Sequence, residues 1–284
     1  MLHRPLALLI AAVALVGCGR TLPAASPVRA QGVAIAGQER TFGFDFERAA
    51  RVPHLGARAI PPANAPAKAD NRQWCAPVGN QGKLQACTAF AMVRGLREYN
   101  QRRFGERATA LSPLWLYYHQ RLHMGAEYVA RDSGSTLSEA AWVMLNLGAP
   151  TEAAWPYLAP QFAVAPSQDA EDGAKRWRLR RPQWLGGWDE AKLFLGNGQA
   201  VAFGFKAYES IKTVKADGIM PMPGQNERLL GGHAVLAVGY DDAKQQVICR
   251  NSWGETYGDH GYFYMPYAFI RDGAMTMDFW TADG

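Results

Sequence analysis

The sequence predicts an α+β fold, because helix signals dominate its first half and strand signals its last third. Helical spacing of apolar residues begins at Cys87, and two helix-start patterns follow before residue 150. Runs of β-branched and aromatic residues are concentrated after about residue 186. The 284 residues, of which 48% are hydrophobic and 19% charged, can form one large domain behind an N-terminal extension. This composition excludes a wholly disordered chain, a coiled coil and a multi-spanning membrane protein.

The helices are expected between residues 71 and about 185. The first runs from residue 87 to about 101 and has one apolar stripe, made of Phe90, Val93, Leu96 and Tyr99. Ser112-Pro113 supplies an N-cap and a proline at the first helical position for a second helix. Thr136-x-x-Glu139 has the spacing of a capping box for a third helix, which Gly148 can end.

The strands are expected between about residue 186 and residue 284. The segments 231–240 and 245–251 are separated by the turn residues 241–244, and this pattern predicts a β-hairpin. In such a hairpin His233, near the start of one strand, and Asn251, at the end of the other, lie at the same end. Two further strands are expected at 199–205 and 261–265.

The first 17 residues have the pattern of a secretory signal peptide. His3-Arg4 precedes an apolar run from Leu6 to Val16, which is shorter than the roughly 20 residues that a membrane-spanning helix needs. Leu15-Val16-Gly17-Cys18 resembles the lipobox of bacterial lipoproteins, in which the signal is cut before a cysteine that then carries lipid. This resemblance implies lipidation of Cys18 and attachment to a lipid bilayer. An ordinary signal peptide with an unmodified cysteine is the alternative.

Residues 18–70 have little helical periodicity and many Ala, Pro, Gly and Arg residues, so they are interpreted as a tether. Within this segment Phe42, Phe44 and Phe46 alternate at a period of two, which places three rings on one side of an extended chain. Such a stripe either packs on the folded domain as a strand or arm, or lies over an active site as a short pro-segment.

The charge is weakly basic and does not predict a nucleic-acid partner. Thirty Lys and Arg residues against 25 Asp and Glu residues give a net charge of +5. His119 and His123 lie one helical turn apart, but no further ligand stands at a metal-binding spacing. No metal and no cofactor is therefore expected.

The candidate catalytic residues are a cysteine and a histidine that are far apart in the sequence. At a helix N-terminus, backbone N–H groups and the helix dipole favour a thiolate, so the pKa of Cys87 is expected to be lowered. A thiolate needs a base, and the base needs an orienting group. His233 and Asn251 supply both, and Trp253 can cover them. A buried, unreactive core cysteine is the structural alternative for Cys87.

Four blocks of sequence resemble the papain-like cysteine peptidases. In chain order they are Asn80–Gly82, Cys87–Ala91, Gly232–Val235 with Val238–Tyr240, and Arg250–Gly254 with Gly258–Tyr262. The resemblance covers about residues 70 to 284. It implies a domain from 71 to 284 with a helical half, about 71–185, that carries Cys87. A β-barrel-like half, about 186–284, would carry His233 and Asn251, with the active-site cleft between the two halves.

The resemblance also implies a role for each matching residue. Cys87 would be the nucleophile, His233 its ion-pair partner and general acid, and Asn251 the group that holds the imidazole. Gln81 would supply the side-chain N–H of the oxyanion hole, together with the backbone N–H of Cys87. The substrate-binding residues implied in the same way are Gly134, Gly232, Trp253 and Tyr257.

The departures from the family pattern lie beside the nucleophile. Leu84-Gln85-Ala86 stands where most members have Cys-Gly-Ser, so a disulfide in this loop is missing, and Thr88 replaces a tryptophan. These changes concern substrate preference, because every catalytic position is filled. With Cys18 lipidated and Cys87 catalytic, Cys75 and Cys249 remain, and their pairing in a disulfide stays open at this point.

The expected protein is an extracytoplasmic, membrane-anchored cysteine endopeptidase that acts on peptide or protein substrates through an acyl-enzyme intermediate. It is expected to be a monomer in a bacterial cell envelope, facing the periplasm or the exterior, with the outer membrane favoured over the inner one in a Gram-negative cell. A non-catalytic binding module on the same fold is one alternative. Acyl transfer on the same residues, such as transglutamination, is another.

Overall fold

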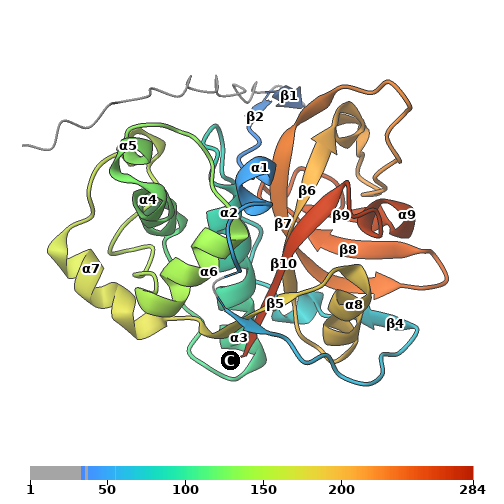
Figure 1. The fold of residues 1–284 in the computed structure, drawn as a ribbon, viewed down its shortest axis with the longest axis horizontal. Helices are drawn as coiled ribbons and strands as arrows, with labels where there is room; N and C mark the ends of the chain where they lie inside the picture. The colour runs from blue at the N-terminus through green and yellow to red at the C-terminus, as the bar shows by residue number, and fades with distance from the viewer. Residues whose placement is uncertain (1–32, 36–37, 55, 284) are drawn as a thin grey trace, which may run out of the picture.

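The computed structural model describes residues 33–35, 38–54 and 56–283. The signal residues 1–17 and Cys18 lie outside the described residues, so cleavage and lipidation at Cys18 stay predictions. Within the described part, no helix is long and apolar enough to cross a membrane. The chain folds into a helical half and a sheet half that lie side by side, as the sequence predicts (Figure 1).

The helical half is built around the helix that begins at Cys87. This helix continues through three successive stretches, and the middle one is π-helical. Two further helices, α4 and α6, pack on it and on each other. The bounds are α2 (Cys87–Ala89), η2 (Phe90–Arg97), α3 (Glu98–Arg103), α4 (Pro113–Met124), α5 (Ala126–Val129), α6 (Leu137–Asn146), η3 (Ala159–Gln161), α7 (Gln168–Ala174) and η4 (Lys175–Trp177).

The predicted helix ends are confirmed, with one exception. The Ser112 side chain accepts a hydrogen bond from the Trp115 backbone N–H at 3.1 Å, and Thr136 accepts one from the Glu139 N–H at 3.0 Å. Gly148 follows the end of α6 with a φ of 86°, the left-handed conformation that favours glycine. The capping box is only half formed, because the Glu139 carboxylate bonds to other side chains.

The sheet half is a twisted antiparallel sheet that wraps round one side of the molecule (Figure 1). Within the described chain it has eight strands, in the order β3-β5-β10-β6-β7-β8-β9, and β4 pairs with β7. Among the described strand pairs of this sheet, only β3 and β5 are parallel. The bounds are β3 (Ala57–Arg58), β4 (Lys68–Asp70), β5 (Arg180–Leu185), α8 (Trp188–Gly196), β6 (Val201–Tyr208), η5 (Glu209–Thr213), β7 (Leu229–Asp241), β8 (Gln246–Arg250), β9 (Tyr262–Pro266), α9 (Tyr267–Ile270) and β10 (Thr276–Asp283).

The core consists of two hydrophobic clusters on opposite faces of this sheet. Alternate residues of β7 enter different clusters: Ala234 and Leu236 face the central helix, whereas Val235 and Ala237 pack towards α8 and α9. This alternation follows from the period of two of a strand. The central helix approaches the sheet closely at Gly95, where an added Cβ would lie 3.4 Å from the Leu236 side chain. Strand β7 therefore joins the two halves and carries His233 at their boundary.

The described residues 41–70, called here the N-terminal arm, pack on the domain along much of their length. The arm follows the β1–β2 hairpin (Val33–Ile35 and Gln38–Arg40) and forms the short helix α1 (Phe46–Ala49). It then adds β3 and β4 to the sheet before the turn η1 (Arg72–Trp74). In Figure 1 α1, in blue, lies at the boundary between the helices and the sheet. The Phe42–Phe46 stripe therefore packs on the folded domain.

The suggested disulfide between Cys75 and Cys249 is absent, because the described cysteines are all free thiols. Cys249 points into the cluster on the α8 side of the sheet, whereas Cys75 packs against the cluster on the other side. The neighbouring Arg250 points towards the Cys75 side, where its guanidinium donates to the carbonyls of Ala76 and Pro77 at 3.3 and 2.8 Å. Because successive strand side chains face opposite ways, Cys249 faces away from Cys75. Their pairing is excluded in this fold.

Candidate active site

Cys87 is the first residue of α2 and is fully buried. The predicted position at a helix N-terminus is confirmed, but the predicted lowering of its pKa is wrong for the arrangement seen here. Burial raises the pKa of Cys87 to about 11, while hydrogen bonds from the backbone of Ala234 and Gly43 act in the opposite direction. The loss of hydration outweighs the helix terminus, so the neutral thiol is favoured.

The β7–β8 hairpin brings His233 and Asn251 together, as their spacing predicts. Leu236 pairs with Arg250, and Asn251 directly follows β8. The Oδ1 atom of Asn251 accepts a hydrogen bond from the Ser252 backbone N–H at 2.8 Å and also lies 2.8 Å from Nε2 of His233. Because a carbonyl oxygen can only accept, Nε2 carries the proton of the neutral ring. Nδ1 is then the basic nitrogen of His233.

The thiol and the imidazole lie on facing elements of the two halves. The backbone of Ala234, the residue after His233, hydrogen-bonds to the Cys87 sulfur, which places the thiol beside the histidine-bearing part of β7. The Trp253 indole stacks on the imidazole with a centroid distance of 4.6 Å and an interplanar angle of 27°. Trp253 is fully buried, so it keeps water away from the bond between His233 and Asn251.

Gln81 is held so that its amide N–H₂ points into the cleft. Its Oε1 accepts a hydrogen bond from the Ser252 hydroxyl at 2.6 Å, and this bond fixes which way the amide is oriented. Nε2 donates to the carbonyl of Leu84 at 2.9 Å and to that of Thr41 at 3.4 Å. The Thr41 carbonyl thus accepts from the N–H group that is predicted to stabilise a developing oxyanion.

The cleft between the halves is occupied by residues 41–46 of the arm, called here the cleft segment. The Phe44 N–H donates to the Gly232 carbonyl at 2.8 Å. On the other side the Ser135 N–H donates to the Gly43 carbonyl at 2.8 Å, and the Asp45 N–H donates to the Ser135 carbonyl at 3.0 Å. The cleft segment therefore bonds to both walls, and Gly43 lies directly over Cys87.

The aromatic rings of the cleft segment fill both sides of the cleft. Phe42 makes edge contacts with His233 and Trp253, at centroid distances of 6.0 and 5.8 Å. Phe44 packs over Gly204, where an added Cβ would lie 2.3 Å from the ring. The two rings are only 2% and 4% exposed. Of the alternatives for the aromatic stripe, the structure thus has the one in which it lies over the candidate active site.

Comparisons with known proteins agree with this geometry. A sequence model described as papain family cysteine protease matches residues 65–276. The chain belongs to the papain family of cysteine proteases. It is 31% identical over 212 residues to an uncharacterized peptidase C1-like protein of Acanthamoeba polyphaga mimivirus, covering 71% of this chain and 68% of that protein. It is 29% identical over 207 residues to cathepsin K of Gallus gallus, covering 70% of this chain but only 58% of that protein.

Solved structures show the same relationship. Xylellain, a cysteine protease from Xylella fastidiosa, superimposes with a TM-score of 0.76 at 28% identity, covering 85% of this chain and 95% of that one. Procathepsin L 3 of Tenebrio molitor has a TM-score of 0.63 at 20% identity and covers 81% of this chain and 74% of that one. The papain-like α+β fold and the assignment to cysteine peptidases, which are hydrolases, are thereby confirmed.

Ser135 is a residue of the cleft wall that the sequence analysis missed. Gly134 was expected to bond to an extended peptide, but its N–H donates to the Tyr117 hydroxyl at 3.1 Å. The next residue, Ser135, makes both wall hydrogen bonds, and Gly134 instead leaves room for the Gly43 carbonyl, 2.1 Å from where its Cβ would be. Gly232, which is predicted to bind substrate, contributes a carbonyl to the cleft. Tyr257 packs edge-on against Trp253, at 4.8 Å, and is itself buried.

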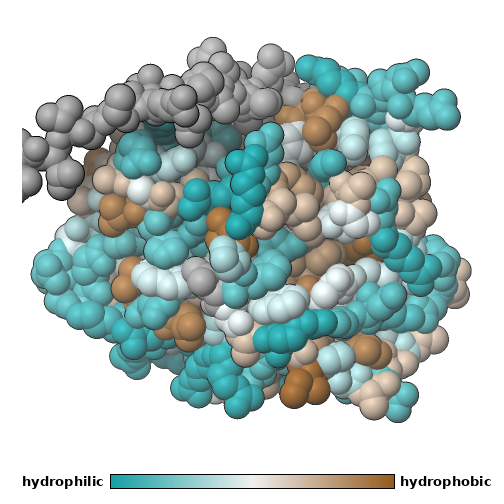
Figure 2. Space-filling view, in the orientation of Figure 1, coloured by the Kyte–Doolittle hydropathy of each residue, from teal (hydrophilic) through white to brown (hydrophobic). Residues whose placement is uncertain are grey.

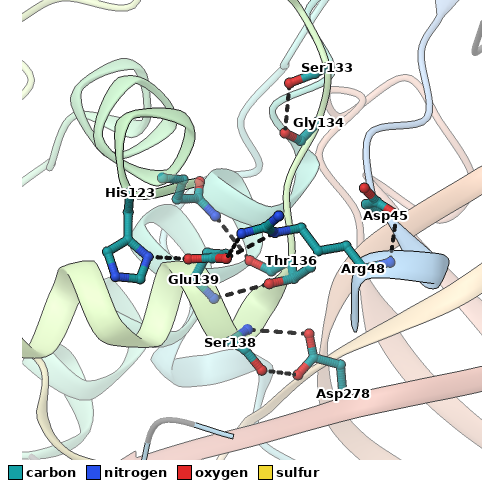
Figure 3. Close-up of polar contacts among 10 residues, drawn as sticks. Asp45, Arg48, His123, Ser133, Gly134, Thr136, Ser138, Glu139 and Asp278 are labelled. Carbon is teal, nitrogen blue, oxygen red and sulfur yellow. Dashed lines mark hydrogen bonds and ion pairs between the residues drawn. The ribbon is translucent and has the colours of Figure 1, made fainter. Parts of the chain in front are cut away.

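Polar contacts beside the cleft anchor the arm, and no local sequence pattern predicts them. Two guanidinium nitrogens of Arg48, in α1, donate to one carboxylate oxygen of Glu139 at 3.0 and 2.7 Å. His123 bonds to the other oxygen, as Figure 3 shows. The Asp45 side chain caps α1 by accepting from the Arg48 N–H at 2.9 Å. The Glu139 side chain is only 1% exposed, so Arg48 neutralises a carboxylate that is almost completely buried.

Two surface cavities lined by described residues are separate from this cleft. Surface cavities of about 610 and 720 Å³ have none of the candidate catalytic residues in their lining. On the face shown in Figure 2, apolar side chains are scattered among polar ones over both halves. In the described part of the chain, no three His, Cys, Asp or Glu side chains are grouped as metal ligands. The polar groups gathered at the cleft are the Cys87 thiol, the His233 imidazole and the side-chain amides of Gln81 and Asn251.

Proposed function

We propose that this cysteine peptidase is an endopeptidase of a bacterial cell envelope, anchored to a membrane through lipid on Cys18 and synthesised with its cleft closed. The observation that carries the proposal is the fixed pair of His233 and Asn251 beside Cys87, covered by residues of the same chain. The lipobox pattern before Cys18 supports the anchor and an extracytoplasmic site, with the outer membrane favoured in a Gram-negative cell.

The catalytic steps follow from the tautomer of His233. Nδ1 takes the proton of Cys87, and the thiolate attacks the carbonyl carbon of the scissile peptide bond. The N–H groups of Gln81 Nε2 and of the Cys87 backbone stabilise the resulting oxyanion. The imidazolium returns its proton to the leaving amine, and water then hydrolyses the acyl-enzyme. Asn251 keeps the proton on Nε2 throughout, so that Nδ1 alone exchanges it.

Endopeptidase activity is favoured by the path of the cleft segment. The chain enters the cleft at Thr41 from β2 and leaves it at Phe46 into α1, so the cleft accepts a polypeptide that continues on both sides. An exopeptidase needs a group that blocks one end of the cleft and binds a chain terminus. Peptide or protein substrates and a monomeric enzyme are part of the same proposal.

The cleft segment also accounts for the control of activity. Gly43 lies over the thiol, Thr41 meets the Gln81 amide, and Phe42 covers His233. A substrate reaches Cys87 only after these residues leave. We therefore propose that the described structure is the inactive precursor form and that removal or displacement of the cleft segment activates it.

The test uses the full-length protein and its Cys87→Ala variant. After limited proteolysis of the arm, the wild type should react with an epoxysuccinyl inhibitor at Cys87 and cleave a denatured protein at internal bonds, whereas the variant should do neither. Cleavage that persists in Cys87→Ala, or an unlabelled thiol after removal of the arm, would contradict the proposal. Products joined rather than cleaved in the mass spectrum would indicate acyl transfer instead. Mass spectrometry and membrane fractionation of Cys18→Ser test the anchor.

A further inference from the structure

Asp132 lies at the junction of the two loops that form the walls of the cleft beside Cys87. One of these loops, residues 81–86, precedes the nucleophile, and the other, residues 133–135, contains Ser135. The nucleophile loop has leucine at position 84, where the family resemblance leads one to expect a disulfide cysteine. Polar contacts of Asp132 connect the two loops instead.

Three hydrogen bonds converge on Asp132. Its Oδ1 accepts the Gln85 backbone N–H at 2.9 Å, and its backbone carbonyl accepts Nε2 of the Gln85 side chain at 2.6 Å. The hydroxyl of Tyr117, a fully buried residue of α4, donates to the same Oδ1. That hydroxyl in turn accepts the Gly134 N–H at 3.1 Å. Asp132 and Tyr117 therefore hold a main-chain group of each loop.

Both of these loops touch the chain that occupies the cleft. An added Cβ on Gly43 would lie 2.0 Å from the Gln85 carbonyl oxygen, so the nucleophile loop lies directly against the occupant. On the opposite side the Ser135 backbone donates to one residue of the occupant and accepts from another. The separation of Gln85 from Ser135 thus determines how closely an extended peptide fits over Cys87.

We propose that Asp132, together with Tyr117, is a positioning residue of the peptidase: it sets the spacing between the nucleophile loop and the Ser135 wall and thereby aligns the bound peptide with the thiol. This inference rests on the proposed peptidase site. Asp132 does not touch the reacting atoms and acts through Gln85 and Ser135. Because its Oδ1 is used only as an acceptor, the carbonyl oxygen of an asparagine can replace it.

The experiment compares two thiol reagents on the full-length protein. Iodoacetamide needs only access to Cys87, whereas a peptidyl epoxysuccinate also needs the wall hydrogen bonds. The ratio of the two second-order labelling rates is independent of how often the cleft segment leaves, since opening affects both reagents equally. In Asp132→Leu, which fills the space without an acceptor, this ratio should fall about 10- to 100-fold, as expected for a misplaced reacting group. Asp132→Asn should stay within about threefold of the wild type, and Tyr117→Phe should fall in the same direction as Asp132→Leu.

Glu127→Leu, at an exposed position of α5, is the matched control and should leave the ratio unchanged. A ratio that stays at the wild-type value in Asp132→Leu, with both rates or only the melting temperature lowered, would show that Asp132 is merely structural and overturn the inference. An equal fall in Asp132→Asn would also overturn it, because the acceptor would then be irrelevant. If neither reagent labels Cys87 in the wild type after removal of the arm, the proposed function fails, and this inference fails with it.

Discussion

Replacing Gly43 by alanine is expected to open the cleft without changing the catalytic residues or the cleft walls. Gly43 belongs to the arm, and its Cα faces the backbone of Gln85. An added Cβ would lie 2.0 Å from the Gln85 carbonyl oxygen, against 3.4 Å for an ordinary contact, so the overlap is 3.4 − 2.0 = 1.4 Å. The obstacle is main chain in the loop that carries the nucleophile, so it cannot rotate away as a side chain would. The cleft segment has to move instead.

The expected magnitude follows from the cost of such an overlap. Overpacking of a fitted site costs about 1–3 kcal/mol. Because this cost destabilises only the closed form, it shifts the equilibrium between closed and open cleft towards the open form by about 5- to 150-fold. The open form should therefore react faster with an epoxysuccinyl inhibitor by a factor within that range. Labelling of Cys87 is followed by intact-protein mass spectrometry, and melting curves confirm that the variant is folded.

The matched control is Gly173→Ala in α7, where an added Cβ has no atom within 4 Å. This variant makes the same chemical change far from the cleft and should label at the wild-type rate. A folded Gly43→Ala protein that labels no faster than the wild type would refute the reasoning. So would an equal acceleration in Gly173→Ala.

Three further outcomes are expected. Arg48→Ala removes one partner of the buried Glu139 carboxylate and destabilises the closed form by about 1–3 kcal/mol. The rate of Cys87 labelling should therefore rise about 5- to 150-fold. Arg51→Ala is the control: its ion pair with Glu47 is exposed, so the labelling rate should not change. Gln81→Ala in the Gly43→Ala protein should lower kcat by about 10²- to 10³-fold with a similar KM, measured by peptide hydrolysis, because the lost donor acts on the oxyanion. Burial raises the pKa of Cys87 to about 11, so labelling of the closed wild type should increase with pH towards that value, since only the thiolate reacts. In Gly43→Ala the same increase should occur at lower pH, because the opened cleft hydrates the thiol. Labelling rates measured from neutral to alkaline pH test this.

The sequence was sufficient where the signal is local. The helix that begins at Cys87 follows from the spacing of its apolar residues, and the caps at Ser112 and Thr136 follow from single side chains. The meeting of His233 with Asn251 follows from one hairpin, in which a short turn determines which residues lie opposite each other. Each of these predictions needs only a few neighbouring residues.

The sequence was not sufficient where the fold joins distant segments. Arg48 and Glu139 are 91 positions apart. The local spacing predicts that the Glu139 carboxylate caps its own helix, whereas in the fold it binds Arg48. The pairing of Cys75 with Cys249 stayed open in the sequence for a related reason. Whether Cys249 faces Cys75 depends on which face of β8 it occupies, and the count of cysteines contains no information about that face.

The fit between arm and cleft separates two kinds of variant. An added Cβ on Gly232 would lie 2.0 Å from the Phe44 carbonyl oxygen, so Gly232→Ala also expels the cleft segment. However, Gly232 belongs to the cleft wall, and a peptide substrate that lies in the same place meets the same obstacle. Gly232→Ala should therefore accelerate labelling by iodoacetamide, as Gly43→Ala does, but should not increase peptide hydrolysis. Peptide hydrolysis that rises equally in both variants would mean that substrate does not follow the path of the cleft segment.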